Sequence, residues 1–273
     1  MAKFDNIVIV SDMDGTFLGK GSRLIPENIE AVKYFNENGG KFTFITGRNH
    51  TTVIHKYPEL VRYISAPVAF HNGACIYDVK KDEIVLQNPL GSELTNDIYR
   101  FLMSLYPEVN ATLRCANEFY SIYPEQFSDW FTEFKEFCHT ITFDKLDTIT
   151  VDKIVFSGEI ESLQKIRKII NEKYGNAIDC TSAGEESVEI MPRGVNKGFA
   201  VQKLRTLPYL SGSSFFAIGD YENDLEMLSE ADVSACPENA LDRVKELCDI
   251  QVCHHDKGAV ADLIRAIEEK YIG

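Results

Sequence analysis

Two carboxylates stand one residue apart at the end of an apolar run, where Asp12 and Asp14 follow Ile7–Val10. Like charges this close repel each other, so the arrangement indicates a stabilising partner such as a bound cation. An Asp-x-Asp pair can open a calcium loop, but that pattern requires glycine where Phe17 stands and glutamate where Arg23 stands. The pair therefore predicts a different kind of acidic site.

A second acidic cluster, Gly219–Asp224, also follows an apolar run and also fails the calcium-loop pattern. If both runs are strands of one parallel sheet, their carboxyl ends face the crevice in which such sheets bind ligands. Magnesium in proteins takes one or two carboxylates together with waters and substrate phosphate oxygens. The two clusters therefore predict a magnesium site, although a single carboxylate at a strand end more often caps a helix or a turn.

Two further polar segments belong to the same hypothesis. Thr46-Gly47-Arg48 ends a second β-rich run, and Lys197 stands at the start of a predicted helix. Taken alone, a Thr-Gly pair is ordinary turn chemistry and a lysine is usually solvated. The four segments together are more specific than any one of them.

The elements that would position these residues alternate between strand and helix at both ends of the chain. Apolar runs without period-two alternation indicate strands buried on both faces, which favours a parallel sheet covered by helices. A helix is expected from Pro26 to Asn38, and a hairpin over residues 74–87 that turns at "KKDE". The expected fold class is α/β, with a doubly wound, mostly parallel, Rossmann-like core.

The middle of the chain departs from this alternation of strand and helix, and the departure predicts an inserted α+β domain. The expected core comprises residues 1–86 and 187–273, and the expected cap comprises residues 87–186. The helices predicted in the insert are Ser92–Leu105, Glu125–Phe137 and Ile160–Tyr174. The strands predicted near it are Ala111–Cys115, Phe119–Ile122, Lys153–Ser157, Ala177–Cys180 and Ser187–Met191.

Composition limits the partners of this 273-residue chain. The formal net charge is -14 and no Lys/Arg run is present, so a small-molecule partner is favoured over nucleic acid. The longest apolar stretches have strand length, and the N-terminus lacks a signal-peptide apolar region, which predicts no membrane association. Seven irregularly spaced cysteines favour free thiols in a reduced cytoplasm. A monomer or a small homo-oligomer is expected.

In order and context, the four segments resemble the motifs of the haloacid dehalogenase superfamily of phosphatases. The family pattern of Asp-x-Asp-Gly-Thr, Ser/Thr, Lys and Gly-Asp-x-x-Asn-Asp matches Asp12–Thr16, Thr46, Lys197 and Gly219–Asp224. The insert looks like the α+β cap of the Cof-type branch, because "HNGACIYD" at residues 71–78 matches the Asn-Gly-Ala stretch before that cap. The resemblance covers the whole chain and is most specific in the core.

The resemblance implies catalytic roles for four residues. Asp12 would attack phosphorus and form an aspartyl-phosphate, which divides one difficult displacement into two steps. Asp14 would protonate the leaving oxygen and then deprotonate the attacking water. Thr46 would donate a hydrogen bond to a phosphoryl oxygen, and Lys197 would neutralise charge on Asp12 and the transferring group.

The same resemblance implies a magnesium cofactor. The Asp12 carboxylate, the Asp14 backbone carbonyl and Asp220 would bind Mg²⁺, with Asp224 supporting these ligands from behind and Asn223 steadying the site. The residues expected to contact substrate or phosphate are Gly15, Thr46, Gly47, Arg48, Lys197 and Asn223.

The function expected from the sequence is magnesium-dependent hydrolysis of small phosphate monoesters, sugar phosphates in particular. A phosphomutase or phosphotransferase of the same superfamily is the nearest alternative, and a receiver-like module phosphorylated on Asp12 is a more distant one, since it needs neither Asp14 nor a cap.

Two other groups of residues are assigned structural roles. Cys248, Cys253, His254 and His255 match no zinc spacing, and an ordinary loop is favoured there. The aromatic residues of the insert are expected mostly in the cap core, with substrate contact as the alternative: Tyr120, Tyr123, Phe127 and Trp130.

Overall fold

The central strand β1 (Ile7–Ser11) is buried on both faces, as its continuous apolar sequence predicts. Val8 and Val10 point into one hydrophobic cluster and Ile9 points into another on the opposite side of the sheet. The computed structural model describes residues 2–123, 137–181 and 187–272. In this part of the chain, β1 lies in a five-stranded sheet of order β14-β13-β12-β1-β2, and all its pairs are parallel.

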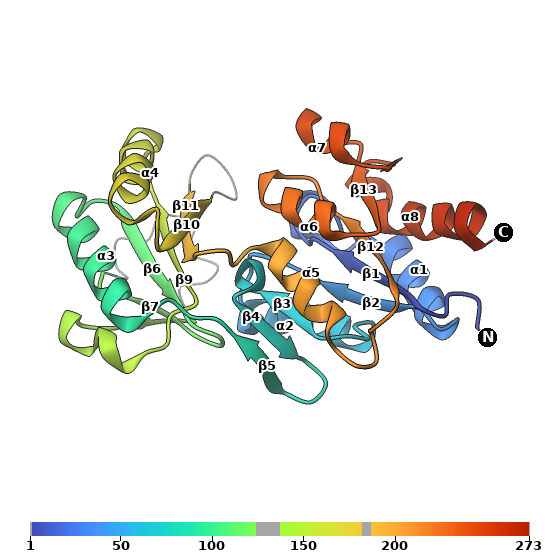
Figure 1. Ribbon diagram of the computed structural model, residues 1–273, viewed down its shortest axis with the longest axis horizontal. Coiled ribbons are helices and arrows are strands. Elements are labelled where there is room, and N and C mark those ends of the chain that lie inside the picture. The colour runs from blue at the N-terminus through green and yellow to red at the C-terminus, as the bar shows by residue number, and fades with distance from the viewer. Residues whose placement is uncertain (1, 124–136, 182–186, 273) are drawn as a thin grey trace.

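Helices cover both faces of this sheet, and the predicted doubly wound core is confirmed (Figure 1). One cluster contains side chains of α1 (Pro26–Glu37) and α8 (Ala259–Ile267), and the other contains side chains of the helices on the opposite face. Those helices are α5 (Lys197–Arg205), α6 (Leu225–Glu230) and α7 (Asp242–Leu247). The other strands of the sheet are β2 (Lys41–Phe44), β12 (Ser214–Ile218), β13 (Val233–Pro237) and β14 (Ile250–Val252).

A three-stranded antiparallel sheet follows α2 (His50–Lys56) and connects the core to the insert. Its strands are β3 (Val68–Phe70), β4 (Cys75–Asp78) and β5 (Glu83–Gln87). The β4–β5 pair is the predicted hairpin. An isolated parallel bridge between Ile45 and Ala69 places β3 beside the end of β2, so the segment after Phe70 lies close to the segment after Ile45.

The insert forms a second layered unit, at the opposite end of the molecule from the parallel sheet (Figure 1). In the described residues its sheet has the order β10-β11-β9-β6-β7-β8, antiparallel except for the β7–β8 pair. Its helices, α3 (Ser92–Leu105) and α4 (Ile160–Tyr174), contribute apolar side chains to one cluster with the sheet. The strands are β6 (Asn110–Arg114), β7 (Phe119–Ser121), β8 (Cys138–Thr140), β9 (Lys153–Ser157), β10 (Ile178–Thr181) and β11 (Ser187–Pro192).

The structure corrects one feature of the predicted division. A boundary at residue 187 assigned β11 to the core, whereas β11 pairs on both sides within the insert sheet, with β9 and β10. Its alternating apolar pattern fits either sheet, and only the pairing distinguishes them. We therefore propose that the cap extends from residue 87 to Pro192 and that the core resumes at Arg193.

Several elements depart from the sequence-based expectation in a smaller way. The short elements α2, β8 and β14 were not predicted, and the predicted helix Glu125–Phe137 falls almost wholly outside the described residues. Among the helices that the structure describes, none combines the length and apolar composition needed to cross a lipid bilayer.

Candidate active site

The two acidic clusters meet at the carboxyl edge of the parallel sheet. Ser11 of β1 stands opposite Ile218 of β12, and the Asp12 backbone N–H donates to the Ile218 carbonyl at 2.9 Å. Asp12 therefore follows β1 directly, and Asp220 lies two residues beyond the end of β12. This adjacency of strand ends brings together carboxylates that are about two hundred residues apart in sequence.

Lys197 lies at the centre of this cluster, at the start of α5. Its Nζ is 2.5 Å from Oδ1 of Asp12 and 2.6 Å from Oδ1 of Asp224. The Lys197 side chain is 1% exposed, so both ion pairs are shielded from water. The two carboxylates outweigh the effect of burial and raise the pKa of Lys197, which keeps the ammonium charged.

The carboxylates outnumber the ammonium, and this excess of negative charge suits a divalent cation. Asp12, Asp220 and Asp224 each offer a carboxylate oxygen within 4.8 Å of the other two. Burial raises the pKa of Asp12 well above its usual range, and burial together with Asp224 raises the pKa of Asp220 to about 7. A bound cation would favour the ionised forms, and carboxylate oxygens are donors that magnesium prefers.

Asp224 differs from the other two carboxylates because its oxygens are already engaged. Its Oδ2 accepts the backbone N–H groups of Asp220 at 2.9 Å and Tyr221 at 3.0 Å, while Oδ1 pairs with Lys197. Asp224 is fully buried. These contacts favour the supporting role expected for Asp224 over direct binding of an ion.

Gly15 and Thr16 shape the loop after β1. Gly15 has a φ of +76°, and a Cβ at this position would lie 2.4 Å from Oδ2 of Asp220, so glycine is required both by conformation and by space. The Thr16 hydroxyl donates to Oδ1 of Asp220 at 2.8 Å. Asn239, which the sequence did not single out, donates from Nδ2 to the Gly15 carbonyl at 2.8 Å.

The segment Thr46–Arg48 contacts the loop after β1 through an ion pair between Arg48 and Asp14. The Arg48 guanidinium donates from Nε and a terminal nitrogen to the two oxygens of Asp14, at 2.7 and 2.6 Å. The Asp14 side chain is 53% exposed, whereas Thr46 is buried at 1% exposure. The Thr46 Oγ1 accepts the backbone N–H of Arg48 at 3.2 Å, so its hydroxyl proton is available to another acceptor.

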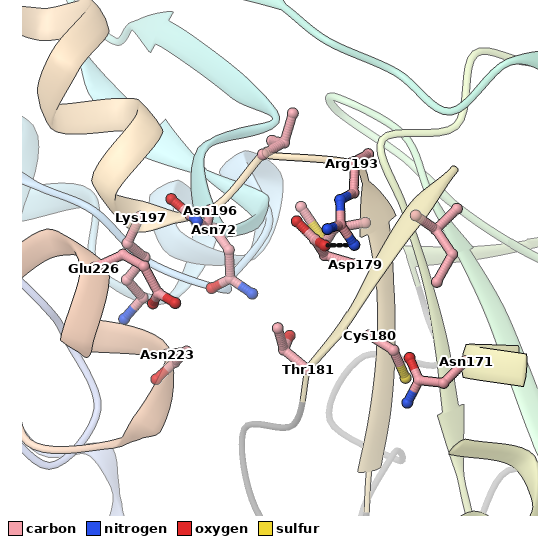
Figure 2. A pocket seen from close by; sticks show the side chains of 13 residues that line it. Asn72, Asn171, Asp179, Cys180, Thr181, Arg193, Asn196, Lys197, Asn223 and Glu226 are labelled. Atoms are coloured by element: carbon pink, nitrogen blue, oxygen red, sulfur yellow. Dashed lines mark ion pairs between the residues drawn. The ribbon is translucent and has the colours of Figure 1, made fainter. Parts of the chain in front are cut away.

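A cavity of about 290 Å³ opens beside Lys197, between the parallel core and the insert (Figure 2). Figure 2 shows Lys197 and Asn223 on one side of this cavity and Thr181 and the Asp179–Arg193 ion pair on the other. Among the described residues that line it, none is aromatic. Its lining combines charged, amide and hydroxyl side chains with the apolar side chains of Ile178, Met191 and Val195, and the cavity extends from the candidate catalytic lysine over the insert sheet.

The predicted residues fall into two groups in space. Contacts join Asp12, Lys197, Asp220 and Asp224 directly, while Asp14 and Arg48 form a separate, more exposed pair. The core-facing edge of the insert contributes residues that the sequence did not reveal: Asp152, Lys153 and Glu189. Their partners, Gly47, His71 and Asn72, lie in the core. A buried charge pair between strands leaves no local sequence signal.

The histidine-rich loop remains assigned to a structural role. His254, His255 and Asp256 have potential ligand atoms within 4.8 Å of one another. However, Nδ1 of His254 accepts the Asp256 backbone N–H at 3.2 Å, and Oδ1 of Asp256 accepts the Lys20 backbone N–H at 2.8 Å. Nδ1 of His255 lies 2.6 Å from the Leu18 carbonyl. These bonds account for the loop without a metal.

The cap aromatics are only partly described. Tyr120 and Tyr123 pack against the hydrophobic cluster of the insert, in agreement with a core role. Phe127 and Trp130 lie outside the described residues.

Comparison with known proteins identifies the family. The chain is 28% identical over 282 residues to the 5-amino-6-(5-phospho-D-ribitylamino)uracil phosphatase of Bacillus subtilis, covering 94% of this chain and 96% of that protein. It is 25% identical over 270 residues to the HMP-PP phosphatase of Serratia proteamaculans, covering 93% and 92%. A solved haloacid dehalogenase-like hydrolase from Bacteroides thetaiotaomicron superposes with a TM-score of 0.82 at 21% identity, covering 97% of this chain and 99% of that one.

The family model of haloacid dehalogenase-like hydrolases matches residues 9–264, which include all four motifs and the insert. The architecture, the order of the motifs and this match agree. The chain belongs to the haloacid dehalogenase-like hydrolase family.

Proposed function

We propose that this chain is a magnesium-dependent phosphatase that hydrolyses small phosphate monoesters through an aspartyl-phosphate on Asp12. The observation that carries the proposal is the buried cluster in which Lys197 bridges Asp12 and Asp224 beside Asp220. Such a cluster holds a carboxylate nucleophile, an ammonium and a cation-binding set of oxygens at one strand edge. The names of the curated relatives support the same reaction class.

The proposed reaction has two displacements. A carboxylate oxygen of Asp12 attacks phosphorus while the bond from phosphorus to the leaving oxygen breaks, and protonated Asp14 donates its proton to that oxygen. Water then attacks the aspartyl-phosphate and transfers a proton to Asp14. Inorganic phosphate and the Asp12 carboxylate are released, so one ester and one water give one alcohol and one phosphate.

The surrounding residues stabilise charge during both displacements. Lys197 contacts the attacking Asp12 carboxylate directly and Thr46 offers its hydroxyl proton to a phosphoryl oxygen. Bound by Asp12, Asp220 and the Asp14 backbone carbonyl, Mg²⁺ would neutralise phosphoryl charge. Arg48, now paired with Asp14, presents a guanidinium for which a substrate phosphate would compete.

We propose sugar or polyol phosphates as the substrate class. The cavity beside Lys197 carries amide, hydroxyl and charged side chains from core and cap, including Asn72, Asn223, Thr181 and Asp179, which match the alternating donors and acceptors of a polyhydroxylated chain. The Bacillus subtilis relative acts on a substrate whose name contains a phosphorylated ribityl chain. We also propose a cytoplasmic enzyme, because the seven cysteines, all within the described residues, form no disulfide.

A phosphate-release screen tests the proposal. Purified protein with Mg²⁺ is assayed against sugar phosphates, polyol phosphates, nucleoside monophosphates and pyridoxal phosphate. Release of free phosphate from a sugar or polyol phosphate is expected. Isomerised sugar phosphate with a requirement for a sugar bisphosphate would instead establish the mutase alternative, and preference for an aromatic nucleoside ester would contradict the substrate class.

A further inference from the structure

A buried ion pair of the cap contacts the phosphate-binding segment of the core. Lys153, on β9, donates from Nζ to Oε1 of Glu189 at 2.7 Å and to the carbonyl oxygen of Gly47 at 2.9 Å. Glu189, on β11, accepts the Asn72 amide at its other oxygen, at 2.7 Å. The Lys153 and Glu189 side chains are 2% and 7% exposed. The pair thus spans two cap strands and two core segments.

The bond to Gly47 has a geometric consequence for Thr46. In a planar trans peptide unit, the carbonyl of one residue and the N–H of the next point in opposite directions. Lys153 holds the Gly47 carbonyl toward the cap, so the N–H of Arg48 points away from it, to Oγ1 of Thr46 at 3.2 Å. With an N–H donated to this oxygen, the Thr46 hydroxyl keeps its proton for a different acceptor.

Glu189 reaches Thr46 by a second route. Asn72, whose side-chain amide donates to Glu189, donates its backbone N–H to the Thr46 carbonyl at 2.9 Å. His71 and Asn72 have φ values of +50° and +54°, a left-handed conformation that non-glycine residues rarely adopt and that persists where surrounding contacts enforce it. Glu189 supplies such a contact from the cap. Both ends of the Lys153–Glu189 pair therefore act on the residue expected to bind phosphate.

Isolated burial of this pair would be unfavourable, since desolvation of two charges commonly exceeds their attraction. Burial lowers the pKa of Lys153, although Glu189 opposes this effect. A hydrophobic pair would fill the same space without the desolvation penalty of two charges. It could not, however, hold the Gly47 carbonyl and the Asn72 amide in fixed directions.

We propose that Lys153, held by Glu189, is a positioning residue through which the docked cap aligns the Thr46 hydroxyl for phosphate binding. The inference rests on the proposed phosphatase function and adds to it a cap residue that acts on the core without touching the substrate. The cap then contributes to phosphoryl transfer as well as to selectivity, and undocking it would release the Gly47–Arg48 peptide.

The principal variant is Lys153→Met combined with Glu189→Gln. Lys153→Met alone would leave the buried Glu189 carboxylate without its hydrogen-bonded ammonium and destabilise the fold. Gln at position 189 removes that charge and keeps an acceptor for Asn72. The matched control is Lys168→Met, because Lys168 is a cap lysine that is 77% exposed on α4. Thermal unfolding and circular dichroism monitor the fold of each variant.

Amide hydrogen exchange tests the geometry without requiring activity. The Arg48 amide, measured by NMR, should exchange about tenfold faster in the double variant than in the wild type, because its peptide plane has lost its anchor. It should be unchanged in the control. Unchanged exchange in the double variant would overturn the proposal.

A mutant cycle with Thr46→Val tests the route to phosphate. In the wild-type background, the double variant should lower kcat/KM for a small aryl phosphate about 100-fold, the size of effect seen when one oxyanion donor is lost. In the Thr46→Val background, the double variant should lower kcat/KM only about threefold or less, because the Thr46 hydroxyl through which it acts has been removed. Equal factors in both backgrounds would show that Lys153 does not act through Thr46.

Lys153→Arg provides a second variant, because it keeps the buried charge paired. We expect its thermal stability to remain near that of the wild type while kcat/KM falls about tenfold through altered donor geometry at Gly47. Full activity in Lys153→Arg would indicate that a charge pair with Glu189 is enough for catalysis. That result would contradict a role of Lys153 in positioning Thr46. The proposed function is tested separately, by measuring whether hydrolysis by the protein depends on Asp12. A failure of the positioning proposal can therefore be distinguished from a failure of the proposed function.

Discussion

Two buried lysines, one in the core and one in the cap, use the same side chain for different purposes. Lys197 lies between two carboxylates, Asp12 and Asp224, whereas Lys153 contacts one carboxylate and one backbone carbonyl. Both side chains are almost fully buried. Because the two side chains have the same residue type and similar burial, the differences between them follow from the groups that they contact.

The net pKa shifts of the two lysines have opposite directions, although carboxylate partners raise the pKa of both. Burial lowers the pKa of each, but two carboxylates reverse this at Lys197, while the single Glu189 is opposed by Arg114 and does not reverse it at Lys153. Lys197 therefore keeps its charge beside Asp12, the proposed nucleophile. Lys153 instead directs hydrogen bonds, so the proposed chemistry and the proposed positioning lie in separate regions of the molecule.

The largest expected effect is that of Asp12→Asn, which removes the charge of the proposed nucleophile and almost none of its volume. Turnover should fall on the order of 10⁵- to 10⁶-fold, as when a catalytic nucleophile is lost in other enzymes. Asp242→Asn, at a side chain that is 98% exposed, is the matched control and should retain full activity. Steady-state phosphate release with a sugar phosphate measures both. More than about one hundredth of wild-type activity in Asp12→Asn would exclude Asp12 as the nucleophile.

Removal of the proposed Mg²⁺ should come next in size, because the core cluster has three carboxylates and one ammonium, that of Lys197. Chelation should abolish phosphate release and Mg²⁺ should restore it. Ca²⁺ should inhibit in competition with Mg²⁺, since it accepts more ligands and can engage both oxygens of Asp12, including the one that must attack. Initial rates over a grid of both ions measure this. Full activity with Ca²⁺ as the sole divalent ion would contradict the arrangement.

Lys197→Met sharpens the contrast with Lys153 directly. Loss of an ammonium that contacts Asp12 should lower kcat/KM about 10²- to 10³-fold. Because Lys197 acts on Asp12 rather than through Thr46, this factor should be the same in the Thr46→Val background, unlike that of the Lys153 variant. The mutant cycle in kcat/KM measures it. A Lys197 effect that disappears with Thr46 would erase the distinction between the two lysines.

The core cluster could be predicted from sequence because each of its members follows an apolar strand or begins a helix. Asp12 and Asp220 stand at strand ends, and parallel pairing of β1 with β12 is enough to bring them together. The helix predicted over Ile160–Tyr174 has the same bounds in the structure.

The cap network could not be predicted in the same way. Lys153 is 106 residues from Gly47 and 36 from Glu189, and a lysine in a strand is normally solvated. Its burial depends on how the cap docks on the core, which no local pattern specifies. The placement of β11 failed for a related reason, because the pattern of a strand indicates a buried face but not its neighbours.

The smallest expected effect concerns pH and a second contact between cap and core. Nδ1 of His71, in the core, lies 3.1 Å from Oδ2 of Asp152, in the cap, and both side chains are fully buried. Burial lowers the pKa of His71 below its ordinary value of 6.5, although Asp152 opposes this effect. His71 is therefore neutral at pH 7 in the folded protein.

The sign of the pH dependence follows from this lowered pKa. Below pH 6.5 the unfolded chain binds a proton at this histidine while the folded protein does not, so the stability that neutral His71 provides is complete above 6.5 and is lost as pH falls through the folded pKa. The melting temperature of the wild type should therefore fall more steeply between pH 7 and pH 5 than that of His71→Gln, and the two curves should converge at low pH. His139→Gln, at a cap histidine that is 57% exposed, should follow the wild type. Parallel curves of melting temperature against pH for the wild type and His71→Gln would show that protonation of His71 does not lower the stability of the folded protein. That result would contradict a neutral, buried His71 beside Asp152.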